Sequence, residues 1–242
     1  MSQFPQFPGT RFVRWYGRVL FSAARVTAAP ALRALYNVRV EGIEAVPAHG
    51  AAVIAPNHLS FLDPFFVALV VPRFITFIGK AEYFDSWQTR VFMELAGVIP
   101  VRREDPSESS LAAGVKVLEA GNLLGIFPEG TRSPDGRLYK GKTGAARMAL
   151  EVGCPVVPTG LIGTRHVLPK EARIPGLGPR VTVKFGRPMT VPSEAKEDSR
   201  LLRTFTDDLM QEIARLTGQE YRHRYAYTKR IGQPPSVVNL FA

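Results

Sequence analysis

A histidine and an aspartate stand five positions apart in the segment PNHLSFLD, residues 56–63, directly after the apolar run AAVIAP. A carboxylate beside a histidine can fix the tautomer of the ring and stabilise the imidazolium that forms when the ring accepts a proton. His58 and Asp63 are therefore candidates for a general base and the residue that orients it. The alternative is structural: Asn57 and Asp63 would cap a turn and the next helix, and His58 would fill a polar pocket.

A second polar segment, FPEGTRS at residues 127–133, follows another apolar run. Gly130 permits the backbone to approach a ligand closely, and the guanidinium of Arg132 offers paired donors for a phosphate group. Glu129 can orient a substrate that carries a hydroxyl group. The alternative is a turn-rich surface loop without a ligand, because Gly, Ser, Pro and Asp are typical turn residues.

A third polar position is formed by Arg102 and Arg103, which follow the apolar run GVIPV. In open α/β sheets, ligands bind beyond the carboxyl ends of the strands. The two arginines, like the segments NHLSFLD and EGTRS, come directly after runs that are typical of strands. We therefore predict that these three groups of side chains converge at one edge of a sheet.

Seven short runs predict strands, because most of them are rich in Val and Ile and closed by Gly or Pro. Helical patterns alternate with the later strands, and three of them end at Gly121, Gly153 and Gly218. This alternation predicts an α/β domain with a mostly parallel central sheet flanked by helices. The predicted strands cover residues 38–42, 51–56, 74–79, 97–102, 122–128, 154–162 and 181–186.

The composition allows a folded protein with an anionic partner. The chain has 242 residues, 45% of them hydrophobic, which is enough for one large domain. Lys and Arg outnumber Asp and Glu by 31 to 21, so nucleic acid, an anionic membrane or a phosphorylated small molecule would each suit the charge of +10. Cys154 is the only cysteine, which excludes an internal disulfide and a multi-cysteine metal site, and the histidines form no metal-binding pattern.

The first 34 residues contain arginines and aromatic residues but no acid. In a helix, Arg11, Arg14, Arg18 and Arg25 would gather on one side, as in helices that lie at a membrane surface. The alternative is a helix that packs on its own domain and exposes its arginines to water. No uninterrupted apolar run reaches the roughly 20 residues that a transmembrane helix needs, so we expect a peripheral or monotopic membrane protein.

These patterns divide the chain into three parts. Residues 1–34 form an N-terminal amphipathic helical segment for membrane contact, and residues 35–220 form the α/β domain. Residues 221–242 contain basic residues and prolines but no acid, so we expect a basic tail with little regular structure of its own.

Four segments in this order resemble the four motifs of the glycerolipid acyltransferases: NHLSFLD, GVIPVRR, FPEGTRS and VVPTG. The resemblance covers about residues 35–190 and is closest to the 1-acylglycerol-3-phosphate acyltransferases. It implies transfer of a fatty acyl chain from an acyl-coenzyme A or acyl-carrier-protein thioester to the free hydroxyl of lysophosphatidic acid, giving phosphatidic acid. It also implies contact with membrane lipids at the cytoplasmic face of a cell membrane. No cofactor is expected besides the acyl donor, which is a substrate.

The resemblance also implies roles for individual residues. His58 would be the general base and Asp63 its partner. Attack of an alcohol on a thioester suits this assignment, because neutral imidazole can take the hydroxyl proton near pH 7. Backbone amides near Ser60 or Gly130 are expected to meet the oxyanion. The residues placed around the glycerol phosphate are Lys80, Arg102, Arg103, Glu129, Gly130, Thr131 and Arg132.

Three alternatives to the interpretation as a 1-acylglycerol-3-phosphate acyltransferase remain. The first is a member of the same family that acts on a different lysolipid. The second is a nucleic-acid-binding module, but the arginines concentrate in an aromatic-rich N-terminal segment and at strand ends, and no nucleic-acid-binding motif is visible. The third is a non-catalytic lipid-binding protein of the same fold, against which the intact His58 and Asp63 pair argues.

Overall fold

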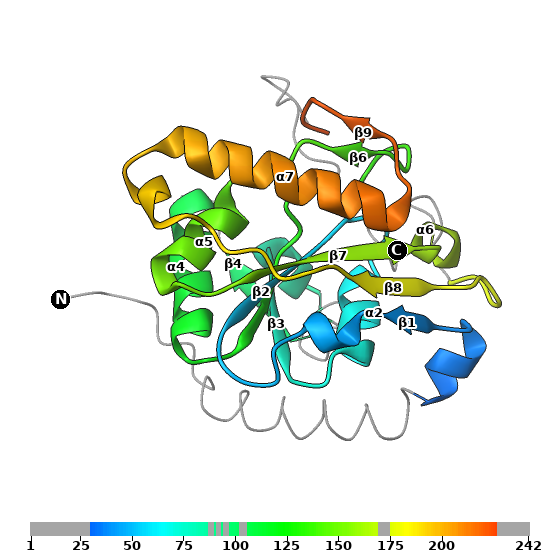
Figure 1. The fold of residues 1–242 in the computed structure, drawn as a ribbon. Coiled ribbons are helices and arrows are strands. Elements are labelled where there is room, and N and C mark those ends of the chain that lie inside the picture. The colour runs from blue at the N-terminus through cyan, green and yellow to red at the C-terminus, as the bar shows by residue number, and fades with distance from the viewer. Residues whose placement is uncertain are drawn as a thin grey trace.

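The structure is a computed structural model that describes residues 30–86, 90, 93, 97–101, 106–168 and 175–226. At its centre lies a seven-stranded sheet in the order β1-β8-β7-β2-β5-β3-β4, with helices on both faces (Figure 1). Every predicted strand run overlaps one strand of this sheet. The strands are β1 Arg39–Glu41, β2 Ala52–Pro56, β3 Ile75–Lys80, β4 Val98–Val101, β5 Leu123–Gly125, β7 Val156–Ile162 and β8 Thr182–Phe185.

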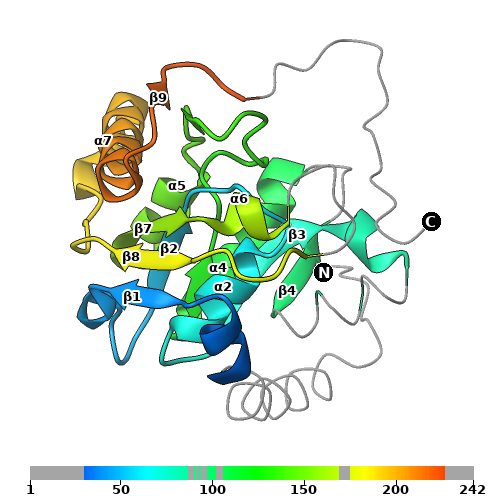
Figure 2. The ribbon, with the colours of Figure 1, turned by 90° about the vertical axis from the view of Figure 1, so that its right-hand side faces the viewer.

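The sheet is mostly parallel, which confirms the prediction. Five neighbouring strands, β7, β2, β5, β3 and β4, are joined by parallel pairing. β8 runs antiparallel to β7, and β1 runs parallel to β8. The carboxyl ends of the five parallel strands therefore meet at one edge, and β8 and β1 begin at that same edge. Figure 2 looks onto this edge, where β7 leads into α6.

Apolar side chains on the two faces of the sheet form two separate cores, because successive residues of a strand point to opposite sides. Along β2, Ile54 packs on one side with α2, whereas Val53 and Ala55 pack on the other with α4, α5 and α7. The helices are α2 Asp63–Val70, α4 Pro106–Glu119, α5 Gly144–Val152, the short α6 Thr164–Val167 and α7 Ser199–Thr217, and the 3-10 turns are η1 Ile43–Ala45, η2 Ala81–Phe84 and η3 Ser193–Lys196.

The predicted helix ends at Gly153 and Gly218 are confirmed. Gly153 follows α5 with φ +70°, and Gly218 follows α7 with φ +72°, a left-handed conformation that glycine adopts at little cost. At the other end of α7, the side chain of Asp198 accepts a hydrogen bond of 2.8 Å from the backbone N–H of Arg200. This contact satisfies one of the free amides of the first helical turn.

A separate two-stranded sheet was not predicted from the sequence. β6 Leu138–Tyr139 pairs in parallel with β9 Tyr221–Arg222 (Figure 1). The segment expected as an irregular tail from residue 221 therefore begins with a strand that joins the α/β domain. Strands of two residues give no readable alternation, which is why sequence patterns miss them. Residues 227–242 and 1–29 lie outside the described residues.

Within the part of the chain that the structure describes, no helix is long and apolar enough to cross a lipid bilayer. The same part contains no group of three or more His, Cys, Asp or Glu side chains arranged to hold a metal ion. The predicted N-terminal membrane-contact helix falls almost entirely on residues that are not described, so it stays a prediction.

Candidate active site

The segment after β2 folds into a turn that brings His58 and Asp63 together. Nδ1 of His58 lies 2.8 Å from Oδ2 of Asp63. The same carboxylate oxygen accepts the backbone N–H groups of Leu59 at 2.6 Å and Ser60 at 2.7 Å. Asp63 is also the first residue of α2 and is fully buried. One oxygen of Asp63 therefore shapes the turn, as the structural interpretation expects, although no side-chain hydrogen bond caps α2. The same oxygen holds the imidazole, as the chemical interpretation requires.

The contact with Asp63 decides which ring nitrogen of His58 is basic. A carboxylate accepts hydrogen bonds, so Nδ1 carries the proton and Nε2 is left as the nitrogen with a free lone pair. The His58 ring stacks on Phe127, with ring centroids 3.9 Å apart and an angle of 18° between the planes. The His58 side chain is 18% exposed. The ring is thus fixed by its two neighbours while part of it still meets solvent.

The backbone of His58 is tied to the FPEGTRS segment on both sides. Its N–H donates to Oε1 of Glu129 at 3.0 Å, and its C=O accepts the N–H of Ser133 at 2.8 Å. The second oxygen of Glu129 accepts the backbone N–H of Tyr139 at 3.1 Å. Two of the three predicted groups therefore converge, and the glutamate is the link between them.

Burial raises the pKa of Glu129 from 4.5 to about 7. The hydrogen bonds from the backbone N–H groups of His58 and Tyr139 act in the opposite direction, while the nearby Asp63 and Asp135 carboxylates add to the increase. The side chain is only 3% exposed. Glu129 is therefore a buried carboxyl group whose two oxygens each accept a hydrogen bond from the protein backbone.

The turn after Glu129 carries two cationic side chains at its surface. Gly130 has φ +70°, and a Cβ added there would lie 3.1 Å from both Cε and Nζ of Lys142. The ammonium group of Lys142 therefore lies directly over the turn. Arg132 is half-buried in the same segment. Neither cation makes a hydrogen bond or ion pair through its side chain with any residue that the structure describes.

The cationic residues expected from other strands are placed less fully. Lys80 is the last residue of β3 and pairs with Val101 of β4, which puts its backbone at the same edge of the sheet as the turn. Its side chain is outside what the structure describes, as are Arg102 and Arg103 entirely. Their roles at the site stay predictions.

Amides near Ser60 or Gly130 were expected to meet an oxyanion, and those of Ser60 and Gly130 themselves are already occupied. The N–H of Ser60 donates to Asp63, and the N–H of Gly130 donates to the carbonyl of Phe127 at 3.0 Å. The turn and the helix start need these bonds, so these two amides are not available. The next two amides of the segment, those of Thr131 and Arg132, have no acceptor among the described residues.

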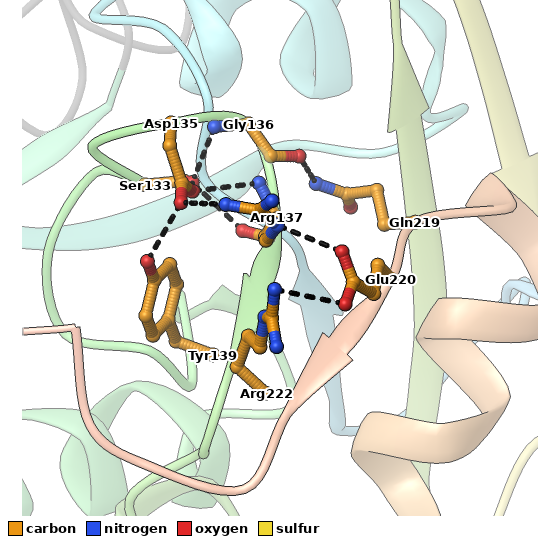
Figure 3. Close-up of polar contacts among 8 residues, drawn as sticks. All are labelled: Ser133, Asp135, Gly136, Arg137, Tyr139, Gln219, Glu220 and Arg222. Carbon is orange, nitrogen blue, oxygen red and sulfur yellow. Dashed lines mark hydrogen bonds and ion pairs between the residues drawn. The ribbon is translucent and has the colours of Figure 1, made fainter.

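A polar network behind the site holds the loop that follows Arg132 (Figure 3). The amide of Gln219 accepts from Nδ2 of Asn57 at 2.8 Å and donates to the carbonyl of Gly136 at 2.6 Å. Asn57 in turn exchanges two hydrogen bonds with the backbone of Leu161 at the end of β7. Asn57 is fully buried. Its role is therefore to join the NHLSFLD turn to β7 and to the residues after α7.

The same loop is fixed by charged side chains. Asp135 accepts from Nη1 of Arg137 at 2.7 Å and from the hydroxyl of Tyr139 at 3.0 Å, and Nε of Arg137 donates to Glu220 at 2.7 Å (Figure 3). Glu220 also pairs with Arg222 of β9 at 2.9 Å. Burial alone would raise the pKa of Asp135, but the hydrogen bonds from Arg137 and Tyr139 lower it to about 2.

Sequence reasoning did not find Gln219 or Lys142. Gln219 lies 162 positions from Asn57, and a single glutamine after a helix carries no signal of such a contact. Lys142 had a weak signal, because it belongs to the basic stretch YKGK shortly after FPEGTRS. The VVPTG motif proves to be part of β7 and is buried from Val156 to Thr159.

Comparison with known proteins places the chain in a family. Residues 37–162, just over half of the chain, match the family described as acyltransferase. The chain belongs to the acyltransferase family. The matched residues include the His58–Asp63 turn and the FPEGTRS segment, so the site lies inside the part that defines the family.

Two relatives of this acyltransferase are named 1-acyl-sn-glycerol-3-phosphate acyltransferase. The chloroplastic protein of Arabidopsis thaliana is 36% identical over 149 residues, which are 60% of this chain and 42% of that protein. The protein of Bacillus subtilis is 34% identical over 129 residues, which are 52% of this chain and 63% of that protein. The alignments thus span less than two thirds of either relative.

The crystal structure of the 1-acyl-sn-glycerophosphate acyltransferase PlsC from Thermotoga maritima has a similar fold. It superposes with a TM-score of 0.62 at 23% sequence identity, covering 85% of this chain and 87% of that one. This similarity shows the fold of the acyltransferase, and its coverage of 85% of the chain exceeds the stretch of residues 37–162 that matches the family.

Proposed function

We propose that this acyltransferase moves a fatty acyl chain from an acyl-coenzyme A or acyl-carrier-protein thioester to the free hydroxyl of 1-acylglycerol-3-phosphate, giving phosphatidic acid. The observation that carries the proposal is the His58–Asp63 pair, fixed at 2.8 Å and tied through its backbone to a turn whose two cations, Arg132 and Lys142, have no side-chain partner among the described residues. The names of the relatives support this acceptor.

In the proposed reaction, Nε2 of His58 takes the proton of the acceptor hydroxyl while its oxygen attacks the thioester carbon. The new C–O bond forms, the tetrahedral intermediate collapses, and the C–S bond breaks. The departing thiolate takes a proton from the imidazolium, which restores neutral His58. The buried Asp63 carboxylate stabilises the imidazolium in between. No acyl-enzyme is needed, because a thiolate is a good leaving group for direct transfer.

The negative charges of the reaction would be met by the 130–132 turn. The backbone amides of Thr131 and Arg132, which have no acceptor among the described residues, are the donors near Gly130 that we assign to the oxyanion. The guanidinium of Arg132 and the ammonium of Lys142 would bind the acceptor phosphate. Glycine at position 130 keeps the space beneath Lys142 open.

Glu129 acts in this proposal through the backbone and not through the substrate. Both of its oxygens bind backbone N–H groups, one of which belongs to His58. It is therefore a positioning residue, which sets the distance between the base and the phosphate-binding turn.

We place the enzyme at the cytoplasmic face of a membrane, where its lysolipid substrate is found.

The test is an assay of the purified full chain with a panel of lysolipids and with both classes of acyl donor, read by mass spectrometry. His58→Ala is expected to lower kcat for phosphatidic acid formation by roughly 10²- to 10⁴-fold, because it removes the general base. His49→Ala, which changes an exposed histidine in the loop before β2, is the matched control and keeps wild-type turnover.

Two results would overturn the proposal. A folded His58→Ala variant with near wild-type turnover would remove the histidine from the chemistry. Preference of the wild-type enzyme for a lysolipid without the glycerol-3-phosphate headgroup would keep the reaction but replace the acceptor.

A further inference from the structure

One loop of the protein exposes an apolar side chain at the active-site edge. Leu177 is 78% exposed, more than any other large hydrophobic residue that the structure describes. It stands between two glycines and two prolines in PGLGP, residues 175–179, and Gly178 has φ +90°. The backbone N–H of Gly176 donates to the carbonyl of Val167 at 2.7 Å, which ties the loop to α6. Leu177 therefore projects outward from an anchored loop.

A second exposed apolar segment precedes β1, the strand that pairs with β8 after this loop. The helical turn at residues 30–35 carries Leu32 and Leu35, which are 39% and 43% exposed. It leads into Tyr36, whose carbonyl accepts the N–H of Val181 at 3.0 Å. Because β1 and β8 both begin at the carboxyl edge of the parallel strands, both segments lie at the edge that also carries His58 (Figure 2).

The charges of the two segments are all positive. Residues 30–40 and 175–181 contain Arg33, Arg39 and Arg180, each exposed, and no Asp or Glu. Leucines separated by arginines are typical of surfaces that dip into the headgroup layer of an anionic bilayer. A protein interface would instead have a continuous apolar core with few charges.

We propose that Leu177, Leu32 and Leu35, with the three arginines around them, form a lipid-contact surface that docks the active-site edge on an anionic membrane. This surface is built from residues 30–40 and 175–181, and it needs no part of the catalytic chemistry. The inference rests on the proposed function in one respect. If the substrate is a lysolipid, docking this surface would bring the edge of the sheet that carries His58 to the bilayer from which the substrate comes.

The test measures binding of the full chain to vesicles of phosphatidylglycerol and phosphatidylcholine, with vesicles of phosphatidylcholine alone for comparison. Leu177→Asp is expected to weaken binding to the anionic vesicles about tenfold or more, because it removes an exposed leucine that would insert into the bilayer and adds a negative charge. Arg180→Glu is expected to weaken it about five- to tenfold. Arg147→Glu, the same charge change on the exposed side of α5, is the control and leaves binding within about twofold.

Leu177→Trp gives a readout that does not depend on loss of binding. Its fluorescence, after subtraction of the wild-type signal, is expected to shift to the blue on adding anionic vesicles and to be quenched by brominated lipid. An unshifted emission, wild-type binding by Leu177→Asp, or an equal loss with Arg147→Glu would each overturn the proposal. Failure of the wild-type chain to bind either kind of vesicle would also overturn it. A change of oligomeric state in Leu177→Asp would overturn it as well, because the surface would then contact a second copy of the chain.

Failure of this surface and failure of the proposed function give different results. If only the surface is wrong, the variants bind vesicles like the wild type and transfer to phosphatidic acid persists. If only the function is wrong, Leu177→Asp still loses vesicle binding while the wild type makes no phosphatidic acid.

Discussion

The two segments that build the site are held in opposite ways. The 57–63 turn closes largely on itself, because Asp63 binds His58, Leu59 and Ser60 within five positions of sequence. The 129–139 segment is held from far away, by the backbone of His58 and by Gln219 and Glu220 after α7. The difference separates their tasks: a local turn fixes the proton acceptor, and long-range contacts set where the substrate-binding loop stands.

The two buried carboxylates show this contrast most clearly. Asp63 places three donors on a single oxygen, and no hydrogen-bond partner is found for its Oδ1 among the described residues. Glu129 places one backbone donor on each oxygen. The charge of Asp63 is thus directed at the imidazole of His58, while Glu129 joins two stretches of backbone.

Asp63→Asn should give the largest effect, a fall in kcat of about a thousandfold or more, because an amide supports the wrong tautomer of His58 and cannot stabilise the imidazolium. KM for the acceptor should change little, since Asp63 is fully buried and cannot contact the acceptor phosphate. Steady-state kinetics of the purified variant measure both quantities.

The control for this variant is Asp135→Asn, which changes an aspartate that also accepts backbone and side-chain donors but lies on the other segment. It should keep most of kcat. If Asp63→Asn lowered thermal stability and left kcat of the folded enzyme intact, Asp63 would only shape the turn, and the contrast between the two segments would be lost.

Local patterns are the part of this molecule that the sequence predicts well. Seven strands and the ends at Gly153 and Gly218 follow from apolar runs closed by Gly or Pro, and the His58–Asp63 contact spans only five positions. The meeting of His58 with the FPEGTRS segment could be predicted as well, because carboxyl ends of parallel strands share an edge.

What could not be predicted depends on contacts across the whole chain. Gln219 reaches Asn57 only because α7 ends beside β7, and β9 forms only because β6 offers it an edge. The part played by Glu129 was expected at the substrate, but its burial and its backbone partners are visible only in three dimensions. The position of Lys142 over Gly130 also depends on the path of the loop between them.

Glu129→Gln should give the second-largest effect, which is on the free energy of unfolding and its dependence on pH. The folded pKa of about 7 lies above the ordinary 4.5, so the stabilising contribution of Glu129 is full below pH 4.5 and is lost as the pH rises through 7. This loss corresponds to about 3 kcal/mol of unfolding free energy. Glutamine does not titrate and should remove that part of the slope.

Urea unfolding at several values between pH 4.5 and 8 measures the slope for both proteins. Identical slopes would mean that Glu129 titrates alike in the folded and unfolded chains. The burial of this carboxyl would then have no energetic consequence, and the comparison with Asp63 would have to be redrawn.

The smallest effects concern the cations. Those without a side-chain partner among the described residues should matter for substrate binding, and those held in ion pairs should not. Arg132→Ala should raise KM for the acceptor about tenfold or more, and Lys142→Met several-fold, because each removes a charge that can face the phosphate. Arg137→Ala is the matched control, since its guanidinium is already bound to Asp135 and Glu220 on the same loop. If the two first substitutions act on one phosphate, their effects on KM should not add in the double variant. Equal increases in KM for Arg132→Ala and Arg137→Ala would show that the loop acts as a whole. Ion pairing would then not distinguish the arginine that binds substrate from the arginine that fixes the loop.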